Sequence, residues 1–418
     1  MTLVYGLGRS GLGVLRFLAR RGRAACFHDD RPRPADLAAA RALGFAACDP
    51  EPGRFRTVIA APGVPIDHPA LVALERAGAE VIGEVELAWR ETGLPLVGVT
   101  GTAGKTTTTV FTARLLEELG VAAAAAGNID PPLVEVADRP GLEAAVVELS
   151  SFQLERVRAF RPRVAVLLNL GTDHLDRHGS LERYHAAKLR LLANLTPEDA
   201  LVYNAADPRV RAAAEGSPAR LVPFEPAAEP RATNARAAAL AAAALAGALG
   251  RAADPGALEA RALELPAVPG RFETVGRVGD VVVIDDSIAT RTEAVRAALQ
   301  AAPAPVAWIV GGEDKGADLG ALEPVVRERV ALVLAIGRDG PRFARAFAPY
   351  ARTVVIKEPE GPRALERALE TALAAGGVAS VLLAPLAASF DQFEDYKHRS
   401  RAFREALVRV GGEAWTAS

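Results

Sequence analysis

Short runs of β-branched residues alternate with helical patterns along almost the whole chain. The runs lie at residues 3–5, 57–60, 96–99, 145–147, 164–168, 281–284, 306–310, 332–336 and 381–383. Strands that alternate with helices are typical of parallel sheets, because each crossover between parallel strands uses a helix. The sequence therefore predicts an α/β protein with mostly parallel, doubly wound sheets.

The chain is too long for one hydrophobic core. It has 418 residues, and two turn-rich segments, 91–95 and 265–270, are candidate joints between domains. These joints predict three domains, at residues 1–92, 93–267 and 268–418.

Composition and charge exclude several classes of protein. A net charge of −2 gives no broad basic field for nucleic acid or an anionic membrane. No uninterrupted apolar run approaches the roughly 18 residues of a membrane span, and the opening residues read as a strand and a turn. We therefore expect a cytoplasmic protein without nucleic-acid or membrane partners.

The two cysteines, Cys26 and Cys48, lack metal-ligand spacing, so we expect reduced, mostly buried thiols.

Lysine is scarce in this chain. Of 49 Lys plus Arg residues, the lysines are Lys105, Lys188, Lys315, Lys357 and Lys397. Only lysine offers a compact, titratable amine, so a chain this rich in arginine should keep lysine mainly where a guanidinium fails. The first three lysines lie in segments typical of phosphate or carboxylate chemistry, and we take them as active-site candidates.

A glycine-rich turn, Gly6-Leu-Gly-Arg-Ser-Gly11, follows the first strand, and Asp29 and Asp30 end the next apolar run. Such a turn lets backbone N–H groups approach a diphosphate at a helix N-terminus, and an acidic residue can hold a ribose. The pattern favours a UDP-like or other nucleotide, but it also fits a nicotinamide or flavin cofactor, or a structural turn. A second turn, Ala61-Pro62-Gly63, could close the same crevice.

A variant P-loop follows the strand at residues 96–99. The strict pattern has glycine at position 99, where this chain has Val99. A strand, a glycine-rich loop and a helix start point successive amides at phosphates, with Lys105 near the β and γ oxygens and the Thr106 hydroxyl on Mg²⁺. We therefore expect ATP binding by Gly101, Thr102, Gly104, Lys105, Thr106 and Thr107.

Potential metal ligands follow the next strands. Glu148 ends one strand, and His174 and His178 follow another. Because strand ends of a parallel sheet share one edge, Glu148 and His174 could hold Mg²⁺ there; for His178 we favour a solvated loop position. Lys188 lies on a predicted helix with Tyr184 four residues before it, on the same face.

Four segments of the last third, at residues 269–273, 284–290, 311–316 and 384–393, carry small and polar residues at strand ends or the joint. Together they predict one edge of a binding site, where the ends of these strands meet. Arg271 and Lys315 are its candidate clamps for a carboxylate or a transition state.

In this order, these segments resemble the Mur ligase family of ATP-dependent amide ligases. The motifs that match, over nearly the whole chain, are G-x-G-x-x-G, A-P-G, T-G-T-x-G-K-T, G-N-I, E-L-S-S-F-Q-L, D-H-x-D-R, Y-x-A-A-K, R-F-E, D-S-x-A-T, G-G-x-x-K and A-S-x-D-Q-F. The resemblance implies a Rossmann-like N-terminal domain for a UDP-substrate, a P-loop NTPase-like central domain for ATP, and a Rossmann-like C-terminal domain for an amino acid.

The implied activity adds D-glutamate to UDP-N-acetylmuramoyl-L-alanine through an acyl phosphate, in peptidoglycan precursor synthesis, with ATP and two Mg²⁺ sites. A monomer is expected.

The resemblance also implies residue roles. Lys105, Lys188, His174 and Arg271 would be catalytic, with Lys188 carbamylated, and the metal ligands would be Thr106, Glu148, His174 and Lys188. Asn234, Arg271 and Asp286 would contact the nucleotide. The UDP-substrate would bind Gly8, Arg9, Ser10, Asp29, Arg31, Pro62, Gly63, Asn128 and Ser150. The amino acid would bind Thr290, Lys315, Ser389 and Phe390.

The amino-acid pocket departs from the family pattern. The usual D-S-K-A-T-N has Ile288 and Arg291 here, the usual P-H-R has Gly270, and the usual G-N-I-G ends in Asp130. Two alternatives follow: a ligase for another amino acid or a folate-like acceptor, and a non-catalytic nucleotide-binding homologue. An oxidoreductase would leave Lys105 unexplained.

Overall fold

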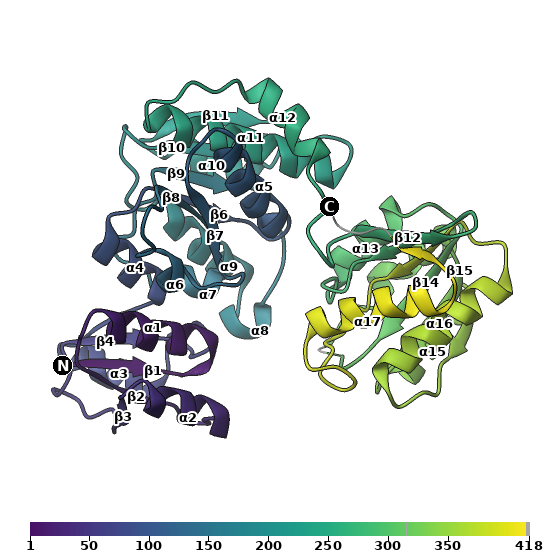
Figure 1. Cartoon of the computed structure of the whole chain (residues 1–418), viewed down its shortest axis with the longest axis horizontal. Helices are drawn as coiled ribbons and strands as arrows, with labels where there is room; N and C mark the ends of the chain where they lie inside the picture. The colour runs from purple at the N-terminus through teal and green to yellow at the C-terminus, as the bar shows by residue number, and fades with distance from the viewer. Residues whose placement is uncertain (315, 415–418) are drawn as a thin grey trace. The chain divides into compact units, whose positions relative to one another are not determined.

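The computed structural model describes residues 1–314 and 316–414, apart from the side chains of Asp176 and Glu293, and contains three sheets flanked by helices (Figure 1). The chain folds into two compact units, Met1–Leu265 and Pro266–Ser418. The first unit holds two of the sheets. The expected joint at 91–95 therefore separates two sheets within one compact unit.

The first domain has a five-stranded parallel sheet in the order β3-β2-β1-β4-β5. Its strands are β1 (Thr2–Tyr5), β2 (Ala25–His28), β3 (Ala46–Ala47), β4 (Thr57–Ala60) and β5 (Glu80–Ile82). Its helices are α1 (Gly8–Arg20), α2 (Pro34–Ala42), α3 (Pro69–Arg76) and α4 (Glu84–Thr92). The chain leaves β1 toward one side and returns to its other side at β4, so the glycine-rich turn lies at a topological switch point, where α/β proteins bind ligands.

The third glycine of this turn is required by packing. A Cβ atom on Gly11 would lie 2.0 Å from the Gly6 carbonyl oxygen. Only glycine therefore lets α1 begin this close to the end of β1.

The expectation of reduced thiols is wrong in this structure, because Cys26 and Cys48 form a disulfide with a Cα–Cα distance of 5.9 Å. Cys26 pairs in register with Ala46 of β3, and Cys48 follows two residues later. Side chains two residues apart on an extended chain point to the same face, so strand register brings the sulfurs together. Sequence spacing alone does not show that register.

The central domain has a six-stranded parallel sheet in the order β11-β10-β9-β6-β8-β7. Its strands are β6 (Leu96–Thr100), β7 (Ala123–Gly127), β8 (Ala144–Glu148), β9 (Val164–Leu167), β10 (Ala200–Asn204) and β11 (Arg220–Phe224). Its helices are α5 (Lys105–Glu118), α6 (Leu133–Val136), α7 (Ser151–Leu154), α8 (Leu175–His178), α9 (Leu181–Leu189), the 3₁₀ helix η1 (Arg190–Leu192), α10 (Pro208–Glu215), α11 (Pro230–Ala248) and α12 (Pro255–Glu264). Strand β6 lies between β8 and β9, so the P-loop that follows it is flanked by the ends of both.

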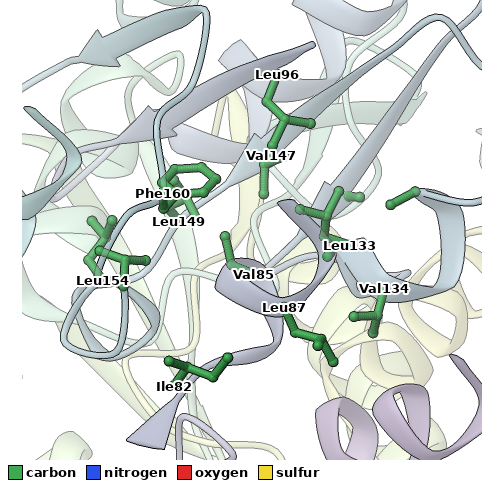
Figure 2. Close-up of a cluster of buried hydrophobic side chains, with 14 of the residues drawn as sticks. Ile82, Val85, Leu87, Leu96, Leu133, Val134, Val147, Leu149, Leu154 and Phe160 are labelled. Carbon is green, nitrogen blue, oxygen red and sulfur yellow. The ribbon is translucent and has the colours of Figure 1, made fainter. Parts of the chain in front are cut away.

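One hydrophobic cluster joins the first two domains. Val85 of α4, Leu133 of α6 and the buried Phe160 belong to it, and Figure 2 shows them with Ile82, Leu96 and Val147. Burial of apolar surface is the main favourable term in folding. The shared cluster explains why residues 1–265 form one compact unit.

The C-terminal unit has a seven-stranded sheet in the order β16-β15-β14-β17-β13-β12-β18. Its strands are β12 (Glu273–Val278), β13 (Val281–Asp285), β14 (Val306–Gly311), β15 (Val330–Ile336), β16 (Arg352–Val355), β17 (Ser380–Leu383) and β18 (Glu413–Ala414), of which β12 is antiparallel to its neighbours. Its helices are α13 (Thr292–Ala301), η2 (Gly320–Leu322), α14 (Glu323–Arg329), α15 (Gly340–Phe347), α16 (Gly361–Ala375) and α17 (Tyr396–Arg409). None of the helices in the described ranges is both long and apolar enough to cross a membrane.

Phe160→Ala should destabilise both domains of the first unit together. Phe160 is fully buried, and its ring packs edge-on against Trp89 of α4, with 6.3 Å between ring centroids. A cavity at this position should lower the free energy of unfolding by about 3 to 5 kcal/mol, measured by urea denaturation. Ile66→Ala is the control, because Ile66 is 45% exposed in the same unit and should change the free energy by less than about 0.5 kcal/mol. Equal effects of the two substitutions would contradict the assigned core.

Candidate active site

The P-loop wraps around its own lysine. Lys105 begins α5, and its Nζ atom donates to the carbonyls of Gly101 (2.9 Å) and Thr102 (3.0 Å). Gly104 has φ +84°, and a Cβ atom there would lie 2.4 Å from Asn234 Oδ1. Glycine at this position therefore lets Asn234 of α11 approach the loop, which brings two sequence-predicted nucleotide contacts together.

Glu148 connects three predicted site segments. It lies at the end of β8 and is 2% exposed. Its carboxylate accepts hydrogen bonds from the Thr106 hydroxyl and from Asn128 Nδ2, the latter at 2.8 Å. The P-loop, the strand end and the loop of Asn128 thus meet at one buried carboxylate.

Lys188 is a buried amine beside the P-loop. It lies on α9 with 2% exposure, and its Nζ atom donates to the Gly101 carbonyl at 2.8 Å. Its Nζ atom also lies 4.7 Å from the ring centroid of Tyr184, whose hydroxyl is 3.2 Å from Thr102 Oγ1. Burial lowers the pKa of Lys188 well below its ordinary value, nearby Lys105 lowers it further, and Glu148 opposes the shift. The site therefore disfavours the charged form of this amine.

His174 precedes α8 in a left-handed backbone conformation, with φ 49°. Its ring packs against Phe152 with 4.5 Å between centroids. His178, which the sequence placed in a solvated loop, is instead buried. Its Nε2 atom lies 3.0 Å from Ser151 Oγ and its Nδ1 atom 3.2 Å from Glu155, because the one-turn helix α8 directs it toward α7.

No group of three or more His, Cys, Asp or Glu side chains in the described part of the chain is arranged to hold a metal. A metal beside Glu148 would therefore need other donors from the protein, such as the Thr106 hydroxyl or a modified Lys188.

The predicted residues of the first domain lie around the strand ends of its sheet. Gly8 and Ser10 lie in the first turn of α1, and Arg31 is exposed. Asp29 accepts from the backbone N–H groups of Leu7 (2.7 Å) and Arg31 (2.8 Å), so it also holds the glycine-rich turn. Pro62 and Gly63 contact the central domain through their carbonyls.

Arg9 reaches from α1 to the central domain. It donates to Asp130 at 2.8 Å and to the Asn128 carbonyl at 3.1 Å. Asp130 is one of the departures from the family pattern, and here it serves as the partner of Arg9.

Sequence reasoning missed Glu84, the first residue of α4. It is buried, and it accepts from Val134 N and from Gln153 Nε2, both at 3.3 Å. Gln153 in turn forms a capping box with Ser150 at the start of α7. Burial raises the pKa of Glu84 to about 7 against the effect of these two donors. Hydrogen bonds thus connect Glu84 of the first domain, through Gln153, to Ser150, which is predicted to bind the UDP-substrate.

In the C-terminal unit, Arg271 and Asp286 interact electrostatically, and Asp286 accepts from Phe272 N at 3.2 Å. Burial raises the pKa of Asp286 to about 7, and the neighbouring Asp285 adds to the rise. Ser389 is buried and Phe390 is 66% exposed. Thr290 follows β13 in a partly buried loop, and Lys315 lies outside the described residues.

Three family models match this chain in order. Residues 1–83 match the MurD-like N-terminal domain of Mur ligases, residues 99–243 the Mur ligase middle domain, and residues 270–386 the glutamate ligase domain of Mur ligases. The three sheets and the P-loop thus define an α/β ligase that uses ATP. The chain belongs to the Mur ligase family.

Relatives with full-length similarity agree with this assignment. The chain is 62% identical over 418 residues to the UDP-N-acetylmuramoylalanine–D-glutamate ligase of Thermus thermophilus, covering 100% of both chains. It is 50% identical to the enzyme of the same name from Deinococcus radiodurans, covering 98% of this chain and 92% of that one. Among solved structures, UDP-N-acetylmuramate-alanine ligase MurC of Thermotoga maritima is similar in fold, with a TM-score of 0.56, 21% identity and coverage of 98% and 99%.

Glu84→Gln should remove a pH dependence of stability. The pKa of Glu84 is about 7 in the folded protein and about 4.3 in an unfolded chain. Between these two pH values the folded state keeps a proton that the unfolded state has lost. A rise in pH across this range therefore lowers the free energy of unfolding of the wild type by up to roughly 3 kcal/mol. The variant should therefore gain stability relative to the wild type from pH 4 to 7, measured by urea denaturation at a series of pH values.

The control for this measurement is Glu80→Gln. A hydrogen bond from Arg90 lowers the pKa of Glu80, so this carboxylate stabilises the fold above its unfolded pKa and loses that effect as pH falls. The difference in free energy of unfolding between Glu80→Gln and the wild type should therefore shrink at acidic pH. A difference between Glu84→Gln and the wild type that stays constant with pH would contradict the assigned burial.

Proposed function

We propose that this chain joins D-glutamate to UDP-N-acetylmuramoyl-L-alanine, as an ADP-forming ligase of peptidoglycan precursor synthesis in the cytoplasm. The observation that carries the proposal is the 62% identity, over the full length of both chains, to an enzyme of that name. The meeting of Lys105, Thr106, Glu148 and Lys188 around one loop supports it.

ATP binds at the P-loop in this proposal. The loop amides and Lys105 hold the β and γ phosphates, and α5 adds the favourable field of a helix N-terminus. Lys105 Nζ donates to two carbonyls of the loop, which places its amine beside the loop that would hold the phosphates. Asn234 beside Gly104 is the proposed nucleotide contact of the first unit. Arg271 and Asp286 are the proposed nucleotide contacts of the C-terminal unit.

Mg²⁺ fits the oxygen donors beside the P-loop. Thr106 and Glu148 offer a hydroxyl and a carboxylate in direct contact, which are the ligand types that Mg²⁺ prefers. His174 and Lys188 complete the proposed set of ligands for two metals. Bound Mg²⁺ would neutralise the charge of the transferring phosphoryl group.

Carbamylation of Lys188 follows from its chemistry. The lowered pKa makes the neutral amine available, and the amine nitrogen can attack CO₂ to form an N–C bond while a proton is released to solvent. The product replaces a buried amine with a carboxylate, which would add a second oxygen ligand for Mg²⁺ near Glu148.

The reaction then proceeds in two steps. The carboxylate oxygen of UDP-N-acetylmuramoyl-L-alanine attacks the γ-phosphorus, the bond to the β-phosphate oxygen breaks, and an acyl phosphate and ADP result. The amine of D-glutamate next attacks the acyl carbon, inorganic phosphate leaves, and the nitrogen loses a proton as the amide forms. Lys105 is proposed to place positive charge beside the transferring phosphoryl group, and Arg271 of the C-terminal unit is proposed as a second stabilising charge.

The remaining predicted residues bind the two other substrates in this proposal. Gly8, Arg9, Ser10, Asp29, Arg31, Pro62, Gly63, Asn128 and Ser150 contact the UDP-substrate. Thr290, Lys315, Ser389 and Phe390 contact D-glutamate, with Arg291 available where the family lysine is replaced by Ile288. The chain acts as a monomer.

Product analysis tests the proposed function directly. With ATP, Mg²⁺ and UDP-N-acetylmuramoyl-L-alanine, we expect phosphate release and a new amide with D-glutamate, but neither with L-glutamate nor with other amino acids, measured by chromatography and phosphate assay. An amide formed faster with another amino acid would favour the related ligase. ATP binding without turnover on any of these substrates would favour a non-catalytic homologue.

Lys188→Arg should abolish activity although it keeps the positive charge, because a guanidinium does not form a carbamate. Lys188→Ala should regain part of its activity with added short carboxylic acids, which can take the place of the carbamate. Turnover at saturating substrates, with and without bicarbonate, measures both effects. Full activity of Lys188→Arg at low bicarbonate would refute the role of Lys188.

A further inference from the structure

Arg177 of the central domain donates to three carbonyls of a first-domain turn, and Arg156 also donates to one of them, Val64 O. Arg177 of α8 donates from Nη1 to Gly63 O (3.1 Å) and from Nη2 to Pro62 O (3.3 Å) and Val64 O (2.9 Å). Its side chain is 18% exposed and also lies 3.6 Å from Glu155. We call residues 62–64 the substrate turn, because Pro62 and Gly63 are proposed to contact the UDP-substrate.

The substrate turn is open on another side. A Cβ atom added to Gly63 would meet nothing within 4 Å. The turn is closed by a hydrogen bond from Val64 N to Ala61 O at 3.0 Å, and Ala61 packs against Gly6 of the glycine-rich turn. The substrate turn therefore lies beside the glycine-rich turn and has open space next to Gly63.

The same arginine is packed against the surroundings of His174. Its guanidinium carbon lies 4.8 Å from the ring centroid of Phe152, and the His174 ring packs on Phe152 at 4.5 Å. The backbone N–H of Arg177 also donates to His174 O at 3.1 Å. The substrate turn, a guanidinium, an aromatic ring and an imidazole thus form one continuous series of contacts.

Helix α8 needs such external support. It has four residues, too few to be stable by itself. His174 at its start has φ 49°, a conformation that a non-glycine residue keeps only when its surroundings hold it. The position of His174 therefore depends on what holds the two ends of α8, and Arg177 connects one of them to the first domain.

We propose that Arg177 is a positioning residue that couples binding of the UDP group at the substrate turn to the placement of His174. This inference rests on the proposed function, which gives the turn its UDP ligand and His174 its metal. A bound nucleotide would fix the three carbonyl acceptors, and the fixed guanidinium would then favour one arrangement of α8. Binding energy far from the reacting atoms would thus help to order the centre where they react.

Hydrogen exchange with UDP-N-acetylglucosamine tests this coupling without metal or ATP. This probe has the nucleotide and the diphosphate but no carboxylate, so it cannot act on His174 through a bound metal. In the wild type, saturating probe should slow exchange of the α8 amides, which donate to His174 O and Leu175 O, by about fivefold or more.

In Arg177→Met the slowing at α8 should disappear, whereas the Val64 amide of the substrate turn should still be protected by the probe. Arg177→Lys keeps the charge and the stem but lacks the planar fork, so it should show the same loss in a protein that remains folded. The control is Arg158→Met, because Arg158 also joins the domains, through Val81 O (3.2 Å) and Glu75 (2.6 Å), but away from the substrate turn. The control should behave as the wild type.

Slowing at α8 that persists in both Arg177 variants, or that is missing in the wild type, would overturn the proposal. In turnover assays, Arg177→Met should lower kcat about tenfold or more while affinity for the probe changes less than about threefold. A change confined to KM would assign Arg177 a purely structural role and also overturn the proposal. A wild type that forms no amide would instead refute the proposed function, and the exchange measurement would still decide the coupling.

Discussion

The hydrophobic cluster shared by the first two sheets is the constraint on which the candidate active site depends. Ile82 and Val85 from the first domain and Leu133 from the second are buried in the same cluster. Because this burial fixes the two sheets against each other, the loops at their strand ends stay within reach of one another. Arg9 can then contact the loop of Asn128, and Arg177 can contact the turn at 62–64.

Electrostatics beside the P-loop follow from that fixed arrangement. The Gly101 carbonyl accepts from both Lys105 and Lys188, so two amines are held close together beside the single carboxylate of Glu148. The more buried amine is the one whose charge is disfavoured. In the proposed function the two amines have different roles: Lys105 binds phosphate, and Lys188, whose pKa burial lowers, is the amine that CO₂ modifies.

The sequence predicted most of the fold and the segments that meet beside the P-loop, because strands and glycine-rich loops leave local patterns. All nine strands expected from β-branched runs occur within two residues of their expected bounds. Strand β7 was missed because it consists of four alanines and a glycine, and β11 because Pro223 lies within it at a sheet edge. The Cys26–Cys48 disulfide and the buried partners of His178 and Glu84 depend on strand register and domain contact, which no local pattern records.

The use of lysine and arginine in the first unit follows one physical difference between them. Lys105 and Lys188 each bring a compact amine to the P-loop, where the proposed function needs a single nitrogen that a phosphate or CO₂ can approach. Arg177 instead donates from both terminal nitrogens of its planar fork to three carbonyls of residues 62–64, and Arg156 donates from Nη2 to the carbonyls of Val64 and Pro65. In the first unit, both lysines therefore lie beside the P-loop, whereas Arg156 and Arg177 lie where its two domains meet.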